Sequence, residues 1–300
     1  MNVPDSTSLK FDFKGLAPVI LAGLAFVFLF YVPAATLLRD WWNDPEAQHG
    51  LLLGPVAFYL AWKRGLGRKL TPQPLLGIAL LTGAVLLRYA SALAAELFTL
   101  RLSLVGALFA LVVFRWGVKQ ALRWWLPFTL LILSIPLPQV ILSSLAFPLQ
   151  LRASRLGAML LEMRDVPVRL EGNLINIPGQ TLFVSEACSG LRSLTALISL
   201  GVLLAALWLR SPLTRLALLV FVIPIAMLVN GIRVFLTGYL VYFVDPSMGE
   251  GFMHMSEGWG LFLVALIITG LVTAGLHYLE GLWAPKPKPI QATPEGVEAS

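Results

Sequence analysis

The chain has 300 residues, of which 58% are hydrophobic and 13% are charged, and its mean hydropathy is +0.81. Soluble domains average about 45–50% apolar and about 25% charged residues, so the composition excludes an ordinary soluble protein. It predicts an all-α polytopic membrane protein. The net charge of +6 does not indicate nucleic-acid binding, because the basic residues lie in short loops and form no compact basic domain.

Eight apolar segments approach the roughly 20 residues that a helix needs to cross a bilayer. They cover about 15–37, 50–62, 74–94, 98–115, 121–142, 191–209, 213–236 and 257–279. The first lacks a convincing cleavage site and more spans follow it, so we expect a retained helix. We therefore predict a cytoplasmic segment at 1–14, a transmembrane domain at 15–280 and a disordered, proline-rich cytoplasmic tail at 281–300.

The basic residues predict how the chain is oriented. Under this assignment the seven lysines all lie on one side of the membrane, which the positive-inside rule makes cytoplasmic. Both termini are then cytoplasmic. The loops on the opposite side carry Asp40, Asp44, Glu46, Glu96, Asp245 and Glu250.

The longest outer segment covers about residues 143–190. Its first part, "LAFPLQLRASRLGAMLLEM", is typical of an amphipathic helix that lies in the membrane interface and contacts lipid. The following "VPVRLEGNLINIPGQTLFV" combines alternating apolar residues with turn signals at "EGN" and "PGQ". It predicts a small extracytoplasmic β-hairpin or short meander, which leads directly to Cys188.

Cys188 is the only cysteine of the chain, in "SEACSGLRSL". It comes just before an apolar run, where the N–H groups of a helix N-terminus and a nearby cation would favour the thiolate. A lone cysteine is more commonly a small buried hydrophobe. Here, however, the neighbours are polar and the predicted side is oxidising, yet no second thiol exists for a disulfide.

Two other segments place candidate residues on the same predicted side. "LVNGIRVF" carries Asn230 and Arg233, which are three residues apart and share a helix face. An arginine at the membrane edge usually faces a partner or a wet cavity, although it can also snorkel to the interface. "GEGFMHMSEGWG" places His254 before the last span, and His49 precedes the second span. A single loop histidine is most often an ordinary surface residue.

The topology brings Cys188, Arg233 and His254 to one membrane face, each from a different helix. A thiolate, an imidazole and a guanidinium are the groups required for acyl transfer through a thioester. His254 would activate the thiol and protonate the leaving amine, and Arg233 would stabilise the oxyanion or orient the substrate. Three scattered histidines make a poor zinc set, so we expect no metal and no cofactor.

"EACSGLRSL", "NGIR" and the histidine before the last span resemble the exosortase family of bacterial membrane transpeptidases. The early "WWNDPEAQHGLLLGPVAFYLAW" and the hairpin "VPVRLEGNLINIPG" are also similar to that family. The resemblance covers about residues 15–280. It implies a catalytic triad of Cys188, Arg233 and His254 in the bacterial inner membrane, with the active site on the periplasmic face.

The resemblance also implies the substrates, which are exported proteins with a C-terminal Pro-Glu-Pro motif, a transmembrane helix and a basic cluster. The enzyme would cleave near the motif and transfer the new carboxyl end to an acceptor, in systems linked to exopolysaccharide. Supporting or substrate-binding candidates are Glu186, Arg192, Asn230 and His49. Glu186 would orient Arg233 or Arg192, or merely balance charge.

Two alternatives remain open from the sequence. A cysteine protease would use the same three groups but pass the acyl group to water. A non-enzymatic membrane subunit of an exopolysaccharide export system would instead require polar residues near the bilayer midplane. Several of the predicted spans show almost none.

Overall fold

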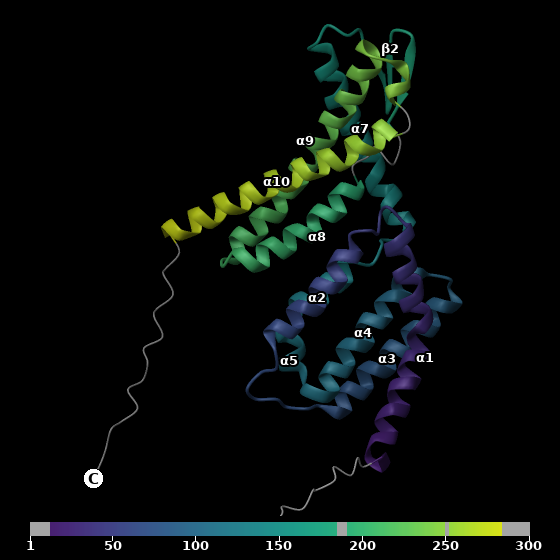
Figure 1. Ribbon diagram of the computed structural model, residues 1–300, viewed down its shortest axis with the longest axis vertical. Coiled ribbons are helices and arrows are strands. Elements are labelled where there is room, and N and C mark those ends of the chain that lie inside the picture. Colours follow the sequence, from purple (N-terminus) through teal and green to yellow (C-terminus); the bar gives the residue numbers. More distant parts are fainter. Residues whose placement is uncertain (1–12, 185–190, 250–251, 284–300) are drawn as a thin grey trace, which may run out of the picture. The chain divides into compact units, whose positions relative to one another are not determined.

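The computed structural model describes residues 13–184, 191–249 and 252–283 (Figure 1). The chain divides into two compact units, Met1–Pro138 and Gln139–Ser300. Each unit is described by itself below. The predicted tail lies outside the described residues from position 284 onward, and helix α10 continues to Trp283.

In its described part, from residue 13 to 138, the first unit consists of helices only. They are α1 (Phe13–Asn43), α2 (Gly50–Arg64), α3 (Pro74–Leu93), α4 (Leu97–Trp116), α5 (Val118–Arg123) and α6 (Trp125–Leu133). Helices α3 and α4 form a hairpin, and Gly77 permits their close approach because a Cβ there would lie 2.5 Å from the Cα of Phe114. Glu96 caps α4, accepting hydrogen bonds from the backbone N–H groups of Phe98 and Thr99.

The basic loops of this unit meet at one end of its helices. Arg64 donates from Nη1 to the carbonyl of Arg123 at 2.9 Å, and Arg123 donates from Nη2 to the carbonyl of Arg64 at 3.1 Å. At the opposite ends of α1 and α4, buried Arg101 pairs with Asp40 at 2.6 Å. The orientation of these two ends relative to the membrane stays a prediction.

The predicted fifth span, 121–142, is not one helix, and this expectation was wrong. Helix α6 is only 9 residues long and ends at Leu133, and the next helix begins at Gln139. The intervening "SIPLP" contains Pro136 and Pro138, which have no N–H to donate and disfavour a helical residue before them. The division between the two units falls at this interruption.

The second unit places a small sheet beside helices. Its elements are α7 (Gln139–Glu162), β1 (Arg169–Glu171), β2 (Leu174–Ile177), β3 (Gln180–Phe183), α8 (Leu191–Trp208), α9 (Pro212–Phe243), the 3₁₀ helix η2 (Pro246–Gly249) and α10 (Phe252–Trp283). The strands form an antiparallel sheet in the order β1-β2-β3, which confirms the small β-structure that the sequence predicts as a hairpin or short meander. Its turns contain the predicted glycines, Gly172 with φ 64° and Gly179 with φ 83°.

Helix α9 packs against different neighbours along its length. Its first part, including Val222, Ala226 and Val229, packs on α8 and α10. Its second part, including Val234 and Val241, packs on α7 and the sheet. Arg233 therefore lies at the change between these two environments.

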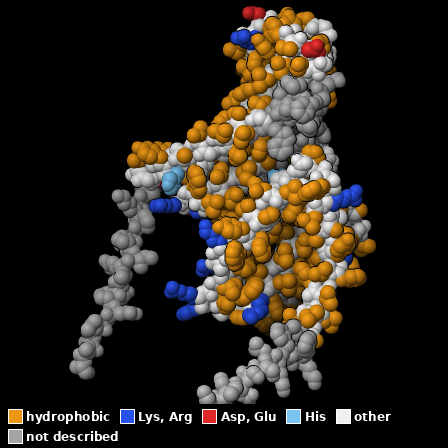
Figure 2. Space-filling view, viewed as in Figure 1, with side chains coloured by type: hydrophobic (Ala, Val, Ile, Leu, Met, Phe, Trp, Pro, Cys, Tyr) orange, Lys and Arg blue, Asp and Glu red, His pale blue; other side chains and the backbone are white. Residues whose placement is uncertain are grey.

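Among the described residues, five helices are long and apolar enough to cross a membrane, within α1, α3, α4, α9 and α10. Helix α8 contributes a shorter apolar helix, Ser193–Trp208, and α2 has 15 residues. The space-filling view shows hydrophobic side chains over the visible faces of the helices (Figure 2). The molecule is a multi-pass membrane protein, and the count of eight spans stays a prediction.

Candidate functional site

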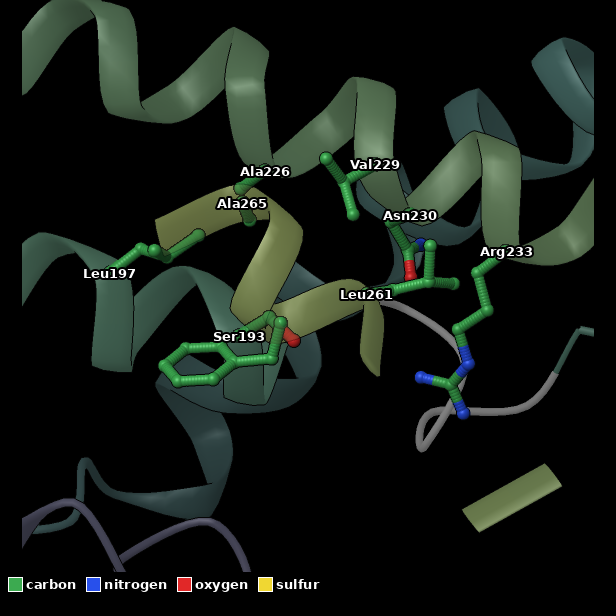
Figure 3. Close-up of a pocket in the computed structure, with 9 residues that line it drawn as sticks. Ser193, Leu197, Ala226, Val229, Asn230, Arg233, Leu261 and Ala265 are labelled. Atoms are coloured by element: carbon green, nitrogen blue, oxygen red, sulfur yellow. The ribbon is translucent and has the colours of Figure 1, made fainter. Parts of the chain in front are cut away.

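A cavity between α8, α9 and α10 contains one of the predicted catalytic residues, Arg233 (Figure 3). Helix α9 contributes a stripe at positions 226, 229, 230 and 233, helix α8 contributes positions 193 and 197, and helix α10 contributes positions 261, 262 and 265. These spacings of three, four and seven residues place each set on one helix face. One face of each of the three helices thus lines the cavity.

Arg233 is half-buried, with its Nε atom buried. Its side chain extends from α9 at the end of the stripe (Figure 3), and its backbone carbonyl accepts a hydrogen bond from Thr237 Oγ1 at 3.0 Å. From Pro212 to Arg233 the helix advances 21 residues (233 minus 212), which is about 32 Å at 1.5 Å per residue. This is close to the roughly 30 Å hydrocarbon thickness of a bilayer.

Asn230 lies beside Arg233 in the cavity wall and is 6% exposed. The structure therefore brings together the two residues that their spacing in the sequence had placed on one face. Both are polar, and a buried amide beside a guanidinium offers several hydrogen-bond donors at one location. This arrangement suits a substrate carbonyl or carboxylate.

Ser193 completes the polar part of the lining, and the sequence analysis did not select it. Ser193 is the third residue of α8, and it follows Cys188 by five positions in the same short motif. That proximity was an available signal. The opposite wall, from Leu261 to Ala265, could not be identified without knowing which helices pack together.

Several predicted residues have no described side-chain position. Cys188 and Glu186 lie outside the described residues, between Val184 and the start of α8 at Leu191. Arg192 lies in the first turn of α8 and His254 in the first turn of α10. Position 254 is seven residues before Leu261 on the same helix, and this separation corresponds to the same helix face.

His49 belongs to the other unit. It precedes α2, and its Nε2 lies 3.1 Å from the carbonyl oxygen of Leu133, near the end of α6. Burial lowers the pKa of His49, although the carbonyls of Leu133 and Glu46 and the charge of Asp44 act in the opposite direction. The ring is therefore neutral at pH 7, and its Nε2–H donates to Leu133.

Trp41 makes a second contact at the end of α6 in the first unit. Its Nε1–H donates to the carbonyl of Ser134 at 2.8 Å, so Trp41 and His49 satisfy two carbonyls where α6 ends. The indole lies against Gly50 and Gly54 of α2, since a Cβ at Gly50 would be 2.1 Å from Nε1. The early aromatic segment thus has a clear structural role.

A family model described as transmembrane exosortase matches residues 41–271. The chain belongs to this family. No curated protein and no solved structure matches it. The match begins at Trp41 and includes every candidate residue of this exosortase, from His49 to His254.

The described part of the exosortase contains no group of three or more His, Cys, Asp or Glu residues that could hold a metal ion. The absence of a metal or cofactor stays a prediction. The chemistry that we consider below uses the side chains of the chain itself.

Proposed function

We propose that this exosortase is a membrane cysteine transpeptidase or protease that cleaves a C-terminal sorting signal through a Cys188 thioester. The substrates are exported proteins that carry a Pro-Glu-Pro motif, a transmembrane helix and a basic cluster. The enzyme acts at the periplasmic face of the inner membrane. The observation that carries the proposal is the position of Arg233 in a cavity formed by α8, α9 and α10.

The three helices support the proposal, because each one carries or directly follows a residue of the proposed triad. Arg233 is on α9, His254 is in the first turn of α10, and Cys188 precedes Leu191, the first residue of α8, by three residues. Three residues of extended chain reach at most about 11 Å. This short separation along the chain supports the assignment of Cys188 to the same site.

The proposed reaction has two steps. The Cys188 thiolate attacks the scissile carbonyl carbon, the C–S bond forms, the C–N bond breaks, and His254 gives a proton to the leaving amine. An acceptor amine or water then gives a proton to His254 and attacks the thioester, and the C–S bond breaks to restore the thiolate. Arg233 donates hydrogen bonds to the oxyanion in both steps.

The first test measures processing of a membrane-anchored reporter with a Pro-Glu-Pro sorting tail, co-expressed with wild type or Cys188→Ala. We expect cleavage to stop while the variant is made and inserted normally. Processing at the parental rate would refute the nucleophile assignment. The mass of the product separates the two outcomes of the second step, because hydrolysis leaves a free carboxyl terminus and transfer leaves the mass of an acceptor.

The second test concerns the guanidinium. Loss of one oxyanion donor costs about 10²–10³-fold in rate, so we expect Arg233→Ala to lower processing by that factor. Arg169→Ala is the matched control, because Arg169 is 81% exposed and pairs with Glu171 on the sheet. Equal rates for the two variants would contradict the role of Arg233.

A further inference from the structure

A second cavity lies in the first unit and contributes no residue to the proposed reaction. It is bordered by α3, α4 and α6, and its volume is about 310 Å³. Leu80 and Leu87 line it from α3, and Leu102 and Phe109 line it from α4. The two residues of each pair are seven positions apart, so both walls extend about 10 Å along their helices. The cavity is therefore elongated in the direction of α3 and α4.

The cavity lies at the middle of these helices. Leu80 is six residues after the first residue of α3, and Leu87 is six residues before its last. Six residues correspond to about 9 Å, so both ends of the cavity are well inside a helix that is long and apolar enough to cross a membrane. Leu80, Leu87 and Ile132 are exposed at its rim. The cavity therefore opens toward the hydrocarbon of a bilayer.

The lining leaves no polar side chain available to a ligand. Ser103 is the one polar side chain among the described residues that line the cavity, and its hydroxyl donates to the carbonyl of Leu100 at 2.6 Å. A buried water needs about two to four polar partners, so this lining does not hold water. An empty space would deprive the walls of dispersion contacts. A ligand that fits here is therefore apolar.

The volume decides between the apolar groups that a membrane offers. A cavity of about 150 Å³ binds benzene, a ring of six carbons, so twice that volume corresponds to roughly twelve carbon atoms. One turn of an α-helix is about 10 Å across and 5.4 Å long, which is about 420 Å³. A transmembrane helix, including that of the proposed substrate, is therefore too wide, whereas part of an acyl chain fits.

We propose that this cavity binds an acyl chain of a membrane phospholipid, which fills the gap between α6 and the hairpin of α3 and α4. Helix α6 packs chiefly against α2. On the side of the cavity, Phe128 packs edge-on against Phe109, with ring centroids 5.2 Å apart. The acyl chain continues this packing toward Ile132, one turn further along α6. The proposal does not depend on the proposed reaction.

Two glycines in the wall leave room for the acyl chain. A Cβ at Gly83 would have nothing within 4 Å, and a Cβ at Gly106 would meet only the Cβ of Ala84, at 3.8 Å. Neither glycine is therefore required for a close approach of helices. A larger side chain at either position would enter the cavity and compete with the lipid.

The experiment uses the full-length protein in nanodiscs of phosphatidylethanolamine and phosphatidylglycerol. A phosphatidylethanolamine that carries a diazirine midway along one acyl chain is added, and mass spectrometry identifies the labelled residues after irradiation. We expect labels on lining residues such as Leu102 and Phe128. Labels confined to exposed residues outside the cavity, such as Leu86, overturn the proposal.

Variants make the labelling specific to this cavity. Gly83→Leu and Gly106→Leu are expected to remove the labels on Leu102 and Phe128 and to leave those on Leu86. Gly23→Leu is the matched control, because Gly23 lies on α1 of the same unit and nothing lies within 4 Å of a Cβ there. Unchanged labelling of the lining in both cavity variants overturns the proposal.

Thermal unfolding provides a gain that misfolding does not produce. In detergent depleted of lipid, Gly83→Leu is expected to unfold about 2–4 °C above Gly23→Leu, because the leucine replaces the missing acyl chain. Added phospholipid should then raise the Tm of Gly23→Leu more than that of Gly83→Leu. Equal Tm values with an equal response to lipid would overturn the site.

The substrate helix is tested as the other occupant. The sorting-tail reporter is added to the nanodiscs, and we expect the labels on Leu102 and Phe128 to persist. Loss of these labels would assign the cavity to the substrate helix and overturn the lipid site. None of these measurements needs processing by Cys188, so the lipid site and the proposed function succeed or fail separately.

Discussion

His49 shows how a single residue can combine a structural contact with a candidate functional role. Its neutral ring donates to the carbonyl of Leu133, and burial lowers its pKa below 6.5. Because the folded-state pKa is depressed, the unfolded chain binds the proton more readily. The contribution of the neutral ring to stability is complete above about pH 6.5 and is lost as the pH falls through the folded-state pKa.

We predict that the free energy of unfolding of the wild type falls relative to that of His49→Gln as the pH is lowered from 7.5 to 5.5. The slope is at most about 1.4 kcal/mol per pH unit for one proton. Thermal unfolding of the detergent-solubilised protein at several pH values measures the difference. Parallel curves for the two proteins would show that His49 does not contribute.

The same variant tests the substrate-binding role of His49. The glutamine amide also donates a hydrogen bond to Leu133, so His49→Gln preserves the contact between α2 and α6. A purely structural residue predicts unchanged processing of the reporter at pH 7.5. A loss of processing without a loss of stability would indicate that the ring contacts the substrate.

At the scale of elements, the packing of α7 on α9 controls where Arg233 lies. A Cβ at Gly231 would be 2.3 Å from Leu156 Cδ2, and a Cβ at Gly157 would be 2.5 Å from Val234 Cγ1. The two helices therefore meet through glycines on both sides. Small residues at helix interfaces allow backbones in membrane proteins to approach closely.

We predict that Gly231→Val destabilises the protein by about 1–3 kcal/mol, the usual cost of overpacking. It should also lower processing, because Gly231 lies between Asn230 and Arg233 in sequence. Thermal unfolding in detergent and the reporter assay measure the two effects. Gly275→Ala in α10 is the control, since nothing lies within 4 Å of a Cβ there, and we expect it to be neutral or stabilising by about 0.5–1 kcal/mol.

Glu280 connects two other elements. It is 2% exposed, and its carboxylate accepts hydrogen bonds from the N–H groups of Arg210 and Ser211 and from the Thr214 hydroxyl. These groups precede or begin α9. The end of α10 therefore satisfies the backbone donors of the turn that joins α8 to α9.

Removing this acceptor should be more harmful than neutralising it. In Glu280→Ala the buried donors lose their acceptor, which costs about 1–3 kcal/mol for each unsatisfied group. Glu280→Gln keeps one oxygen in place, and Oε1 alone accepts from Arg210, Ser211 and Thr214. Unfolding measurements should rank the stabilities as wild type, then Gln, then Ala; equal stability for Ala and wild type would be the contrary result.

The sequence predicted elements best where local chemistry determines them. Gly172 and Gly179 lie in turns that need positive φ, so "EGN" and "PGQ" were sufficient to predict the meander. Continuous hydrophobicity was misleading at 121–142, where Pro136 and Pro138 interrupt the helix. There, the absence of a backbone donor outweighed an apolar composition.

The site was only partly predictable for a similar reason. Asn230 and Arg233 share a face because they lie three apart on one helix, which a sequence reveals. Ser193 and Leu261 line the same cavity only because α8 and α10 pack on α9. No spacing along the chain encodes that packing.

At the scale of the whole molecule, the positive-inside rule assigns one end of each unit to the cytoplasm. In the first unit, Arg64 and Arg123 meet at one end and Glu96 caps α4 at the other. In the second unit, Arg210 precedes α9, and the sheet lies beside its far part. The orientation of each unit in the membrane can therefore be predicted and tested separately.

We predict that both units place their basic ends in the cytoplasm. In a Cys188→Ser background, single cysteines at Ala94 and Thr181 should react with a membrane-impermeant maleimide in intact spheroplasts. Cysteines at Gly67 and Leu213 should react only after permeabilisation, because they lie beside the basic residues at the opposite helix ends. Labelling at Thr181 bears directly on catalysis, since the sheet precedes Cys188 by only a few residues. If the cysteine at Thr181 reacts only after permeabilisation, the sheet lies in the cytoplasm. That result would exclude a reaction at the periplasmic face.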